Sequence, residues 1–201
     1  MNGEESPVAY TEKSTPDPQD AYAQSKWEAE QIQHHVAVET GMEVVVIRPS
    51  LVYGPGVKAN SNSLQLLNIV KRGMPLPLAA VDNRRSLIYV GNLVDAIISC
   101  VNRPEAAGQT YLVSDADDVS TAELIRRMAY ALGKPARLFP FPQSIMRLAG
   151  RILGQSAALD RLLGSLTVDT SKIRRELGWK PPYTMEQGLR ETALWFQRAS
   201  S

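Results

Sequence analysis

One pair of residues in this sequence could carry out proton chemistry: Tyr22 and Lys26, in the segment DAYAQSKWEAE (20–30). Residues four apart on a helix lie on one face, so their side chains can meet. A lysine ammonium beside a tyrosine stabilises the phenolate, which allows the phenol to exchange protons near neutral pH. The same spacing also fits a packed tyrosine beside a solvated lysine, so the surrounding sequence must decide between these interpretations.

The pair is predicted to lie on a helix that is followed by a buried strand. Asp17 or Asp20 can cap the start of this helix, and Gly41 is expected to end it. MEVVVIR (42–48) is a short β-branched run, typical of strands buried in parallel sheets. RPSLVYGPG (48–56) is predicted to be a loop, because proline and glycine interrupt it. A helix followed by a buried strand indicates an α/β fold.

The rest of the chain is predicted to alternate helices and strands. The expected helices lie near 63–72, 92–102, 120–133 and 185–198, and the expected strands lie at 85–90 and 110–114. The helix near 120–133 begins with a predicted capping box of Ser120 and Glu123. The 13 glycines never form G-x-G-x-x-G or G-x-x-G-x-x-G. The sequence therefore lacks the usual glycine-rich loop that holds a dinucleotide pyrophosphate at a helix N-terminus.

The segment YAQSKWEAE, the strand after it and RPSLVYGPG together resemble the NAD-dependent epimerase/dehydratase family of extended short-chain dehydrogenases/reductases. Members share a Tyr-x-x-x-Lys helix followed by a strand that ends in Arg-Pro-x-Asn-Val-Tyr-Gly-Pro. Further segments are similar to the family's in the same order: RRSLIYVGNLVDAI (84–97), DTSKIRRELGWKP (169–181) and GLRETALWF (188–196). Within the family, the chain most resembles the bacterial polysaccharide-biosynthesis branch. This implies a 4-epimerase of UDP-linked N-acetyl- or 6-deoxy-hexosamines, or a reductase of the corresponding 4-keto sugars.

The resemblance implies the C-terminal part of a Rossmann-like, doubly wound parallel α/β fold without its N-terminal glycine-rich βαβ units. Residues 1–56 are expected to be a remnant of the dinucleotide-binding domain. Residues 57–201 are expected to form mainly the UDP-sugar-binding domain, with some segments returning to the first domain. NAD or NADP would bind chiefly to the missing N-terminal part, so this chain alone is expected to be inactive. Exposed sheet edges and helix faces predict self-association, a homodimer or an N-terminal half supplied in trans.

The resemblance also implies roles at the reacting carbon. Tyr22 would exchange the proton at the sugar C4 oxygen, while Lys26 would hold the nicotinamide ribose. The main chain around Pro49 and Ser50 would line the nicotinamide. Leu51 stands where the family usually has a substrate-contacting asparagine, which weakens the case for an ordinary UDP-galactose epimerase and leaves room for a 4-keto reductase.

A second group of residues is expected to bind the diphosphate of the substrate. Arg85 and Arg161 stand where the family's phosphate-binding arginines fall, and arginine suits phosphate through its bidentate geometry. The alternative is that each is an ordinary surface arginine. Asn60 or Asn62, before the helix near 63–72, would contact the diphosphate through a side chain or helix-terminal amides. Ser86 and Gly91 replace acidic residues that are common in the family.

Bulk composition fits an enzyme that acts on a small molecule. The net charge is +1, so no basic excess points to nucleic acid, and no apolar run is long enough to span a membrane. A single cysteine and the lack of a signal peptide predict a cytoplasmic protein. Adjacent His34 and His35 point apart on a helix, so no metal site is expected. QSIMRLAGRILG (143–154) is amphipathic and is expected to pack over the substrate cleft or a partner rather than lie on a membrane.

Two alternatives to a nucleotide-sugar enzyme remain open at this stage. RPSLVYGPG also fits steroid- or flavonoid-type reductases of the same superfamily, although LGWKP and GLRETALWF favour nucleotide sugars. The chain could also be a non-catalytic module that binds sugar nucleotides or assembles with a separate cofactor-binding half.

Overall fold

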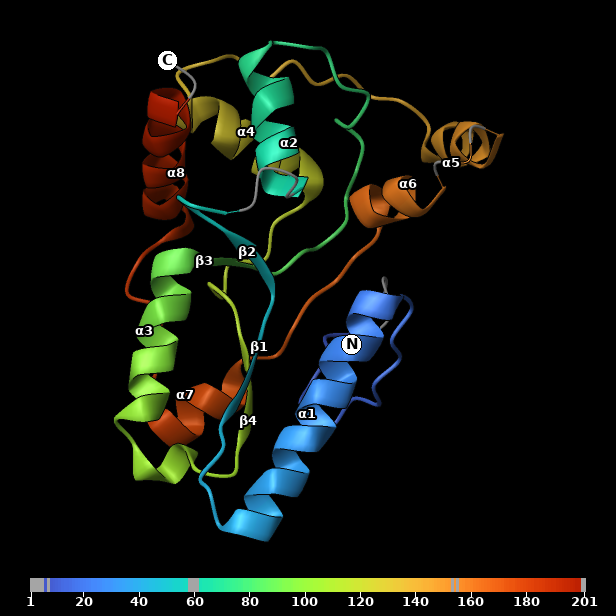
Figure 1. Ribbon diagram of the computed structural model, residues 1–201. Coiled ribbons are helices and arrows are strands. Elements are labelled where there is room, and N and C mark those ends of the chain that lie inside the picture. The colour runs from blue at the N-terminus through green and yellow to red at the C-terminus, as the bar shows by residue number, and fades with distance from the viewer. Residues whose placement is uncertain (1–5, 7, 58–61, 153, 155, 200–201) are drawn as a thin grey trace.

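The computed structural model describes residues 6, 8–57, 62–152, 154 and 156–199 (Figure 1). Two groups of elements lie one above the other in Figure 1, joined by a short parallel strand pair. The lower group consists of α1 (Ala21–Thr40), β1 (Val46–Pro49), α3 (Val90–Val101), the 3₁₀ turn η1 (Pro104–Ala106), β4 (Thr110–Val113) and α7 (Ser171–Leu177). The upper group consists of α2 (Asn62–Lys71), α4 (Thr121–Ala131), α5 (Gln143–Ile152), α6 (Ser156–Leu163) and α8 (Met185–Ala199).

Helix α1 begins and ends as the sequence predicts. The Asp20 carboxylate accepts a hydrogen bond of 2.7 Å from the Ala23 amide, and this caps the first turn. Gly41 ends the helix in the left-handed region at φ 71°, where glycine carries no steric penalty. Among its described residues α1 buries only Glu30. The helix is therefore well defined locally but has little contact with the rest of the chain.

In the lower group, β1 pairs in parallel with β4, with Val46 opposite Thr110. Helices α3 and α7 lie against this pair in Figure 1. Parallel strands are usually covered by helices. Here the side chains of the strands and of the helices beside them form one continuous apolar core. This core contains Ile88, Ala96, Cys100, Ala106, Tyr111, Val113, Ile173, Leu177 and Trp179. Cys100 is buried among them, as the sequence indicates.

The loop predicted at 48–56 is wrong in its first half. Strand β1 continues to Pro49, and β2 (Leu51–Tyr53) pairs in parallel with β3 (Leu87–Tyr89). Proline is tolerated at the end of an edge strand, since the ladder needs no amide there. The next amide, from Ser50, donates to Val113 O at 3.0 Å.

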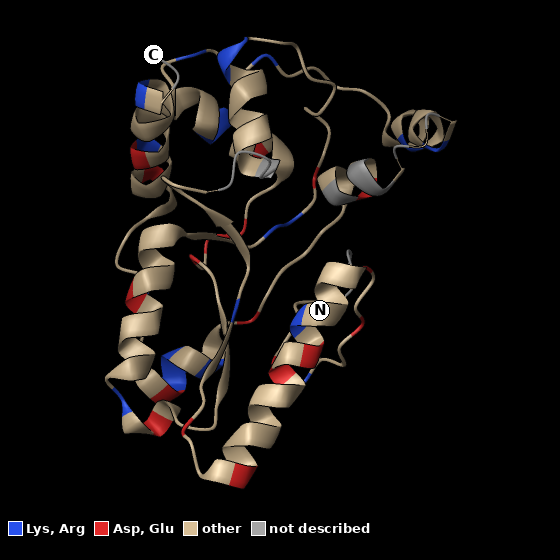
Figure 2. Cartoon of the chain, viewed as in Figure 1, with Lys and Arg blue, Asp and Glu red and all other residues tan. Residues whose placement is uncertain are grey.

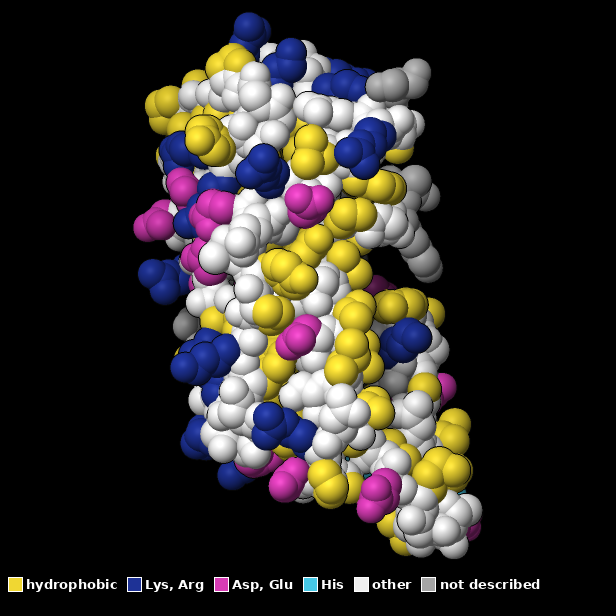
Figure 3. Space-filling model, turned by 90° about the vertical axis from the view of Figure 1, so that its left-hand side faces the viewer, with side chains coloured by type: hydrophobic (Ala, Val, Ile, Leu, Met, Phe, Trp, Pro, Cys, Tyr) yellow, Lys and Arg dark blue, Asp and Glu magenta, His cyan; other side chains and the backbone are white. Residues whose placement is uncertain are grey.

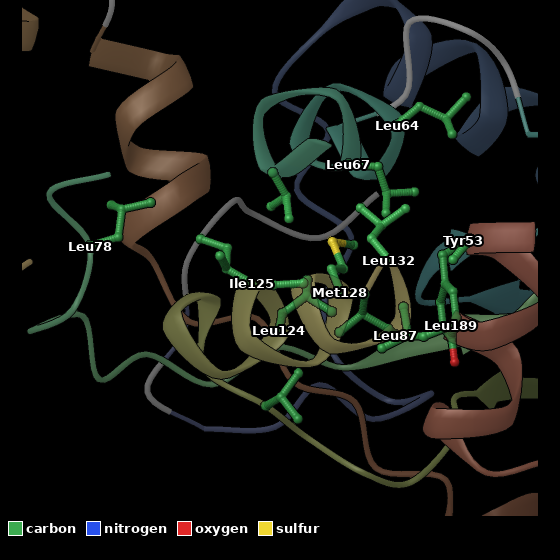
Figure 4. Close-up of a cluster of buried hydrophobic side chains, with 14 of the residues drawn as sticks. Tyr53, Leu64, Leu67, Leu78, Leu87, Leu124, Ile125, Met128, Leu132 and Leu189 are labelled. Atoms are coloured by element: carbon green, nitrogen blue, oxygen red, sulfur yellow. The ribbon is translucent and has the colours of Figure 1, made fainter. Parts of the chain in front are cut away.

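The upper group packs around a second core, which Figure 4 shows in close-up. Leucines of α2 face Ile125 and Met128 of α4, and Leu189 of α8 closes one side. The Ser120 hydroxyl caps α4 by accepting from the Glu123 amide at 3.0 Å, as predicted. The Glu123 carboxylate accepts instead from Arg127 Nε at 3.0 Å, so it forms an ion pair within the helix.

The bounds of β3 and α3 differ slightly from the predicted ones. Strand β3 covers only Leu87–Tyr89, and α3 begins directly at Val90. Helices α7 and α8 are separated by residues 178–184, which matches the predicted break. Trp179 anchors this break, because it is buried and its indole donates to Asp95 Oδ1 at 2.8 Å. Across the described ranges, no helix is both long and apolar enough to cross a bilayer.

Candidate functional site

Tyr22 and Lys26 lie on one face of α1, as their spacing predicts. The Lys26 ammonium lies 5.6 Å from the centre of the Tyr22 ring, within the range of a cation–π contact. The Tyr22 side chain is 70% exposed. Both groups are therefore accessible to a ligand, and the cation is next to the phenol.

A buried ion pair ties the helix of Tyr22 to strand β1. Arg48 donates from Nε to Glu30 Oε2 at 3.1 Å, and from Nη2 to Glu30 Oε1. Glu30 follows Lys26 by four residues, so it lies one turn further along the same face. Arg48 directly precedes Pro49. The ion pair thus connects the helix of Tyr22 and Lys26 to the strand end predicted to line the cofactor.

Ser50, at the end of β1, is buried, and its main-chain amide is used in the sheet. Its hydroxyl oxygen is also buried, and it has no hydrogen-bond partner among the described residues. A buried hydroxyl without a partner costs free energy, and such groups commonly mark ligand sites or strained positions. Ser50 is therefore a free hydrogen-bonding group next to Pro49.

The residues predicted to bind the diphosphate are only partly described. Arg85 lies just before β3, and its guanidinium donates from Nη1 to Gly164 O at 3.2 Å. Asn60 lies outside the described residues. Asn62 is the first residue of α2 and Arg161 lies within α6, but their side chains are not described. In Figure 1, α6 lies in the upper group, whereas α1 lies in the lower group.

The three departures from the family pattern have structural roles. Leu51 lies in β2 opposite Leu87. The Ser86 hydroxyl donates to Asp118 Oδ1 at 2.6 Å and accepts from the Val168 amide at 3.0 Å. At Gly91, an added Cβ would lie 2.5 Å from Cε1 of Tyr89, so no larger residue fits without displacing the ring.

A buried polar network around Asp115 was not found by sequence reasoning. Asp115 accepts from the Tyr53 hydroxyl at 2.8 Å, from the Tyr89 amide at 2.9 Å and from Asn92 Nδ2 at 2.7 Å. Asn92 Oδ1 in turn accepts from the Tyr183 amide at 2.9 Å. The network thereby joins β2, β3 and α3 to the segments after β4 and before α8.

Burial shifts the pKa of both members of the hydrogen bond between Tyr53 and Asp115. Burial raises the pKa of Asp115, although its three hydrogen bonds oppose this shift. Burial, followed by the Asp115 charge, raises the pKa of Tyr53 far above its ordinary value, so the phenol stays protonated and donates. The available sequence signal was positional: Asp115 follows a strand, and polar residues at the carboxyl ends of parallel strands often border sites.

The two histidines do not form a metal site. His34 Nε2 lies 3.9 Å from Glu30, while His35 Nε2 lies 3.1 Å from Glu39. They therefore point to different carboxylates. Among the described residues, no three histidine, cysteine or acidic side chains are grouped so that they could hold a metal ion.

A search among known proteins places the chain in a family. Residues 1–192 match the family model described as GDP-mannose 4,6 dehydratase. A protein of Vibrio cholerae named UDP-glucose 4-epimerase is 48% identical over 185 residues, which covers 92% of this chain and 56% of the relative. The chain thus spans about half the length of this curated relative.

Solved structures show the same fold at lower identity. UDP-glucose 4-epimerase of Thermotoga maritima, solved with UDP-glucose, has a TM-score of 0.74 at 19% identity, covering 99% of this chain and 60% of that one. UDP-glucose 4-epimerase of Thermus thermophilus, solved with NAD, has a TM-score of 0.72 at 22% identity, covering 96% and 59%. These similarities confirm the predicted Rossmann-like parallel α/β class. The chain therefore belongs to the GDP-mannose 4,6-dehydratase family, within the NAD-dependent epimerases and dehydratases of sugar nucleotides.

Proposed function

We propose that this chain is part of an NAD(P)-dependent enzyme that modifies a UDP-hexose or UDP-hexosamine at C4, as an epimerase or a 4-keto reductase. The observation that carries the proposal is the exposed Tyr22 with the Lys26 ammonium beside it, on a helix fixed by a buried ion pair. The 48% identity to a relative named UDP-glucose 4-epimerase supports the same class of reaction.

In the proposed reaction, Tyr22 exchanges a proton with the oxygen on C4 of the sugar. As a phenolate it accepts the hydroxyl proton when C4 is oxidised, and as a phenol it returns the proton when C4 is reduced. Lys26, whose ammonium lies beside the Tyr22 ring, would hold the nicotinamide ribose through a hydrogen bond. NAD(P), when bound, accepts and returns the hydride of C4. The unpartnered hydroxyl of Ser50, next to Pro49, suits a polar group of the cofactor.

We assign residues 1–56 to the cofactor-binding part and residues 57–201 mainly to the sugar-nucleotide part. The parallel pairing of β1 with β4 supports the return of a later segment to the first part. Arg85 and Arg161, with Asn60 or Asn62, are assigned to the substrate diphosphate because arginine binds phosphate through paired N–H groups. Arg85 must then exchange its contact with Gly164 O for the diphosphate.

A chimera tests the proposed activity. The chain replaces the matching 56% of the Vibrio cholerae relative, and the relative supplies the region outside the match. Interconversion of UDP-glucose and UDP-galactose, and of the corresponding N-acetylhexosamines, is followed together with reduction of a UDP-4-keto sugar. We expect Tyr22→Phe to lower kcat by about 10²–10⁴-fold, as for loss of an acid–base group. Tyr130→Phe is the matched control, since Tyr130 is 88% exposed and lies on α4.

Two results would contradict the proposal. The first is a chimera that folds and binds NAD but converts none of these sugars. The second is a Tyr22→Phe variant that is as active as the Tyr130→Phe control. Calorimetric titration of the unmodified chain with UDP and with NAD⁺ tests the division into two parts. Binding of UDP without NAD⁺ is the expected result, whereas binding of NAD⁺ alone would reverse the assignment.

A further inference from the structure

Helix α5 has apolar residues on two opposite faces. Met146 and Gly150 lie on the inner face and are buried. Ile145, Leu148 and Ile152 lie on the other side, within about 60° of one another on an ideal helix. Their side chains are 51%, 58% and 76% exposed. Packing of α5 within the chain therefore does not account for this outer face.

Contacts with α6 fix the orientation of α5. At Gly150, an added Cβ would lie 2.2 Å from Cδ1 of Leu159, so the two helices approach closely there. Arg147 Nη1 donates to Asp160 Oδ1 at 2.7 Å, which adds a polar contact between the same helices. Figure 1 shows α5 at the periphery of the upper group. The outer face of α5 is thus held toward solvent by interactions on its inner face.

The segment that carries this face has only basic charges, and one of them, Arg147, pairs with Asp160 of α6. Residues 128–159 contain no aspartate or glutamate, and their basic residues are Lys134, Arg137, Arg147 and Arg151. Figure 2 shows basic residues on α5 and on the segment that leads into it. The same segment exposes two aromatic side chains, Phe139 at 42% and Phe141 at 36%. Two copies of such a surface would repel each other, which disfavours a symmetric dimer here.

We propose that the outer face of α5 docks on the surface of an anionic lipid bilayer. An exposed apolar face flanked by arginine is the pattern of helices that lie in the membrane interface. Ile145, Leu148 and Ile152 enter the boundary between headgroups and acyl chains, and the exposed Arg137 and Arg151 contact lipid phosphates. With 10 residues, α5 is about 15 Å long, so it lies along the bilayer and does not cross its ~30 Å core.

Vesicle flotation tests this proposal with the unmodified chain. Vesicles of phosphatidylcholine with phosphatidylglycerol are compared with vesicles of phosphatidylcholine alone. We expect binding to the anionic vesicles, weakened by salt. The double variant Leu148→Ser/Ile152→Ser should bind at least about tenfold more weakly, because two apolar side chains no longer enter the interface. The double variant Arg137→Gln/Arg151→Gln should lose about fivefold per charge removed.

The matched control is Ile32→Ser/Val38→Ser, which removes two apolar side chains of α1 at residues that are 63% and 85% exposed. It should bind vesicles as the unmodified chain does. Three results would overturn the proposal: no binding to anionic vesicles, equal binding to both vesicle types, or equal losses in the α5 and α1 variants. Light scattering that shows the Leu148→Ser/Ile152→Ser variant dissociating an oligomer, with no change in vesicle binding, would make this face a protein interface instead.

Discussion

Glu30 and Arg48 form a buried ion pair that joins α1 to β1. Their side chains are 6% and 10% exposed, and two hydrogen bonds connect them. Because α1 buries no other described residue, this ion pair is its principal anchor. Glu30 also lies one turn beyond Lys26. The ion pair therefore fixes the orientation of the helix face that carries Tyr22 and Lys26.

Removing Glu30 should detach α1. In Glu30→Ala, Arg48 is left as an uncompensated buried charge, which costs about 3–5 kcal/mol in typical cases. We expect native-state hydrogen exchange of the α1 amides to accelerate accordingly, while the core of α2 and α4 is less affected. Glu28→Ala is the control, since Glu28 is exposed on the same helix and should change the opening free energy by less than about 0.5 kcal/mol. Similar acceleration in both variants would show that the ion pair is not the anchor.

Replacing both members of the pair separates charge burial from packing. Glu30→Leu/Arg48→Met leaves no unpaired charge, and such replacements are often neutral or stabilising. The double variant should therefore recover most of the hydrogen-exchange protection that Glu30→Ala loses. If it behaves like Glu30→Ala, the specific geometry of the ion pair is required for docking of α1.

Gly188 lets α8 approach the rings of Tyr53 and Tyr89. A Cβ at this position would lie 2.7 Å from the Tyr53 hydroxyl and 2.8 Å from Cγ of Tyr89. Alanine would gain up to ~1 kcal/mol in helix propensity. It would also displace a buried hydroxyl from Asp115, and overpacking typically costs about 1–3 kcal/mol besides. We expect Gly188→Ala to lower the free energy of unfolding by about 2 kcal/mol, measured in urea.

Gly150→Ala is the control for Gly188→Ala. Its Cβ would meet Cδ1 of Leu159 at 2.2 Å, the far end of a flexible side chain that can rotate away. The free energy of unfolding of Gly150→Ala should therefore lie within about 1 kcal/mol of that of the unmodified chain. Equal losses at the two glycines would contradict the argument that rigid rings restrict position 188.

Local signals made parts of the fold predictable. Asp20 and Gly41 define α1 because a cap and a left-handed glycine act within one turn of the helix. Strand β2 was missed because its pairing with β3, some 36 residues later, outweighs the proline and glycine that flank it. Strand pairing of this kind depends on packing between distant segments, which local propensity does not contain.

In the candidate site, too, local features could be predicted from the sequence, whereas contacts between distant segments could not. The spacing of Tyr22 and Lys26 is local and was sufficient to place both on one helix face. The hydrogen bonds of Asp115 depend on four segments that meet only in the folded chain. The pairing of Glu30 with Arg48 is likewise absent from local patterns, because the two charges lie on different elements.

The buried carboxyl of Asp115 should make stability depend on pH. Burial raises its pKa in the folded chain above its ordinary value, which is about 3.9 in the unfolded chain. The folded chain therefore binds more protons in the interval between these two values. This contribution to stability is fully present below the unfolded pKa and is lost as the pH rises through the folded pKa, with a slope of at most ~1.4 kcal/mol per pH unit.

Asp115→Asn should abolish this pH dependence. The substitution costs about 1–3 kcal/mol, since an amide cannot accept three hydrogen bonds as the carboxylate does. The free energies of unfolding of the two proteins, measured in urea from about pH 4 to 7, should converge as the pH rises. Parallel curves over this range would show that Asp115 titrates as it does in the unfolded chain.

Helix α3 exposes an apolar face that should drive self-association. Val94, Ile97, Ile98 and Val101 are 49%, 43%, 53% and 78% exposed, and Figure 3 shows hydrophobic side chains running along this side of the molecule. A groove of about 520 Å³ between α3 and β1 continues the face, with Val45 and Ile47 on its β1 side. Contiguous exposed apolar surfaces of this kind commonly mark interfaces.

We expect light scattering to show concentration-dependent oligomers of the chain. Ile98→Gln/Val101→Gln should weaken the association constant by at least about tenfold, because each substitution removes apolar area that the contact buries. Ile145→Gln on α5 is the control, since Ile145 is 51% exposed but lies in a segment that carries only positive charges. A monomer at all concentrations, or an equal effect of the α5 substitution, would contradict association through α3. Loss of association in the α3 variant alone would identify this face as the contact.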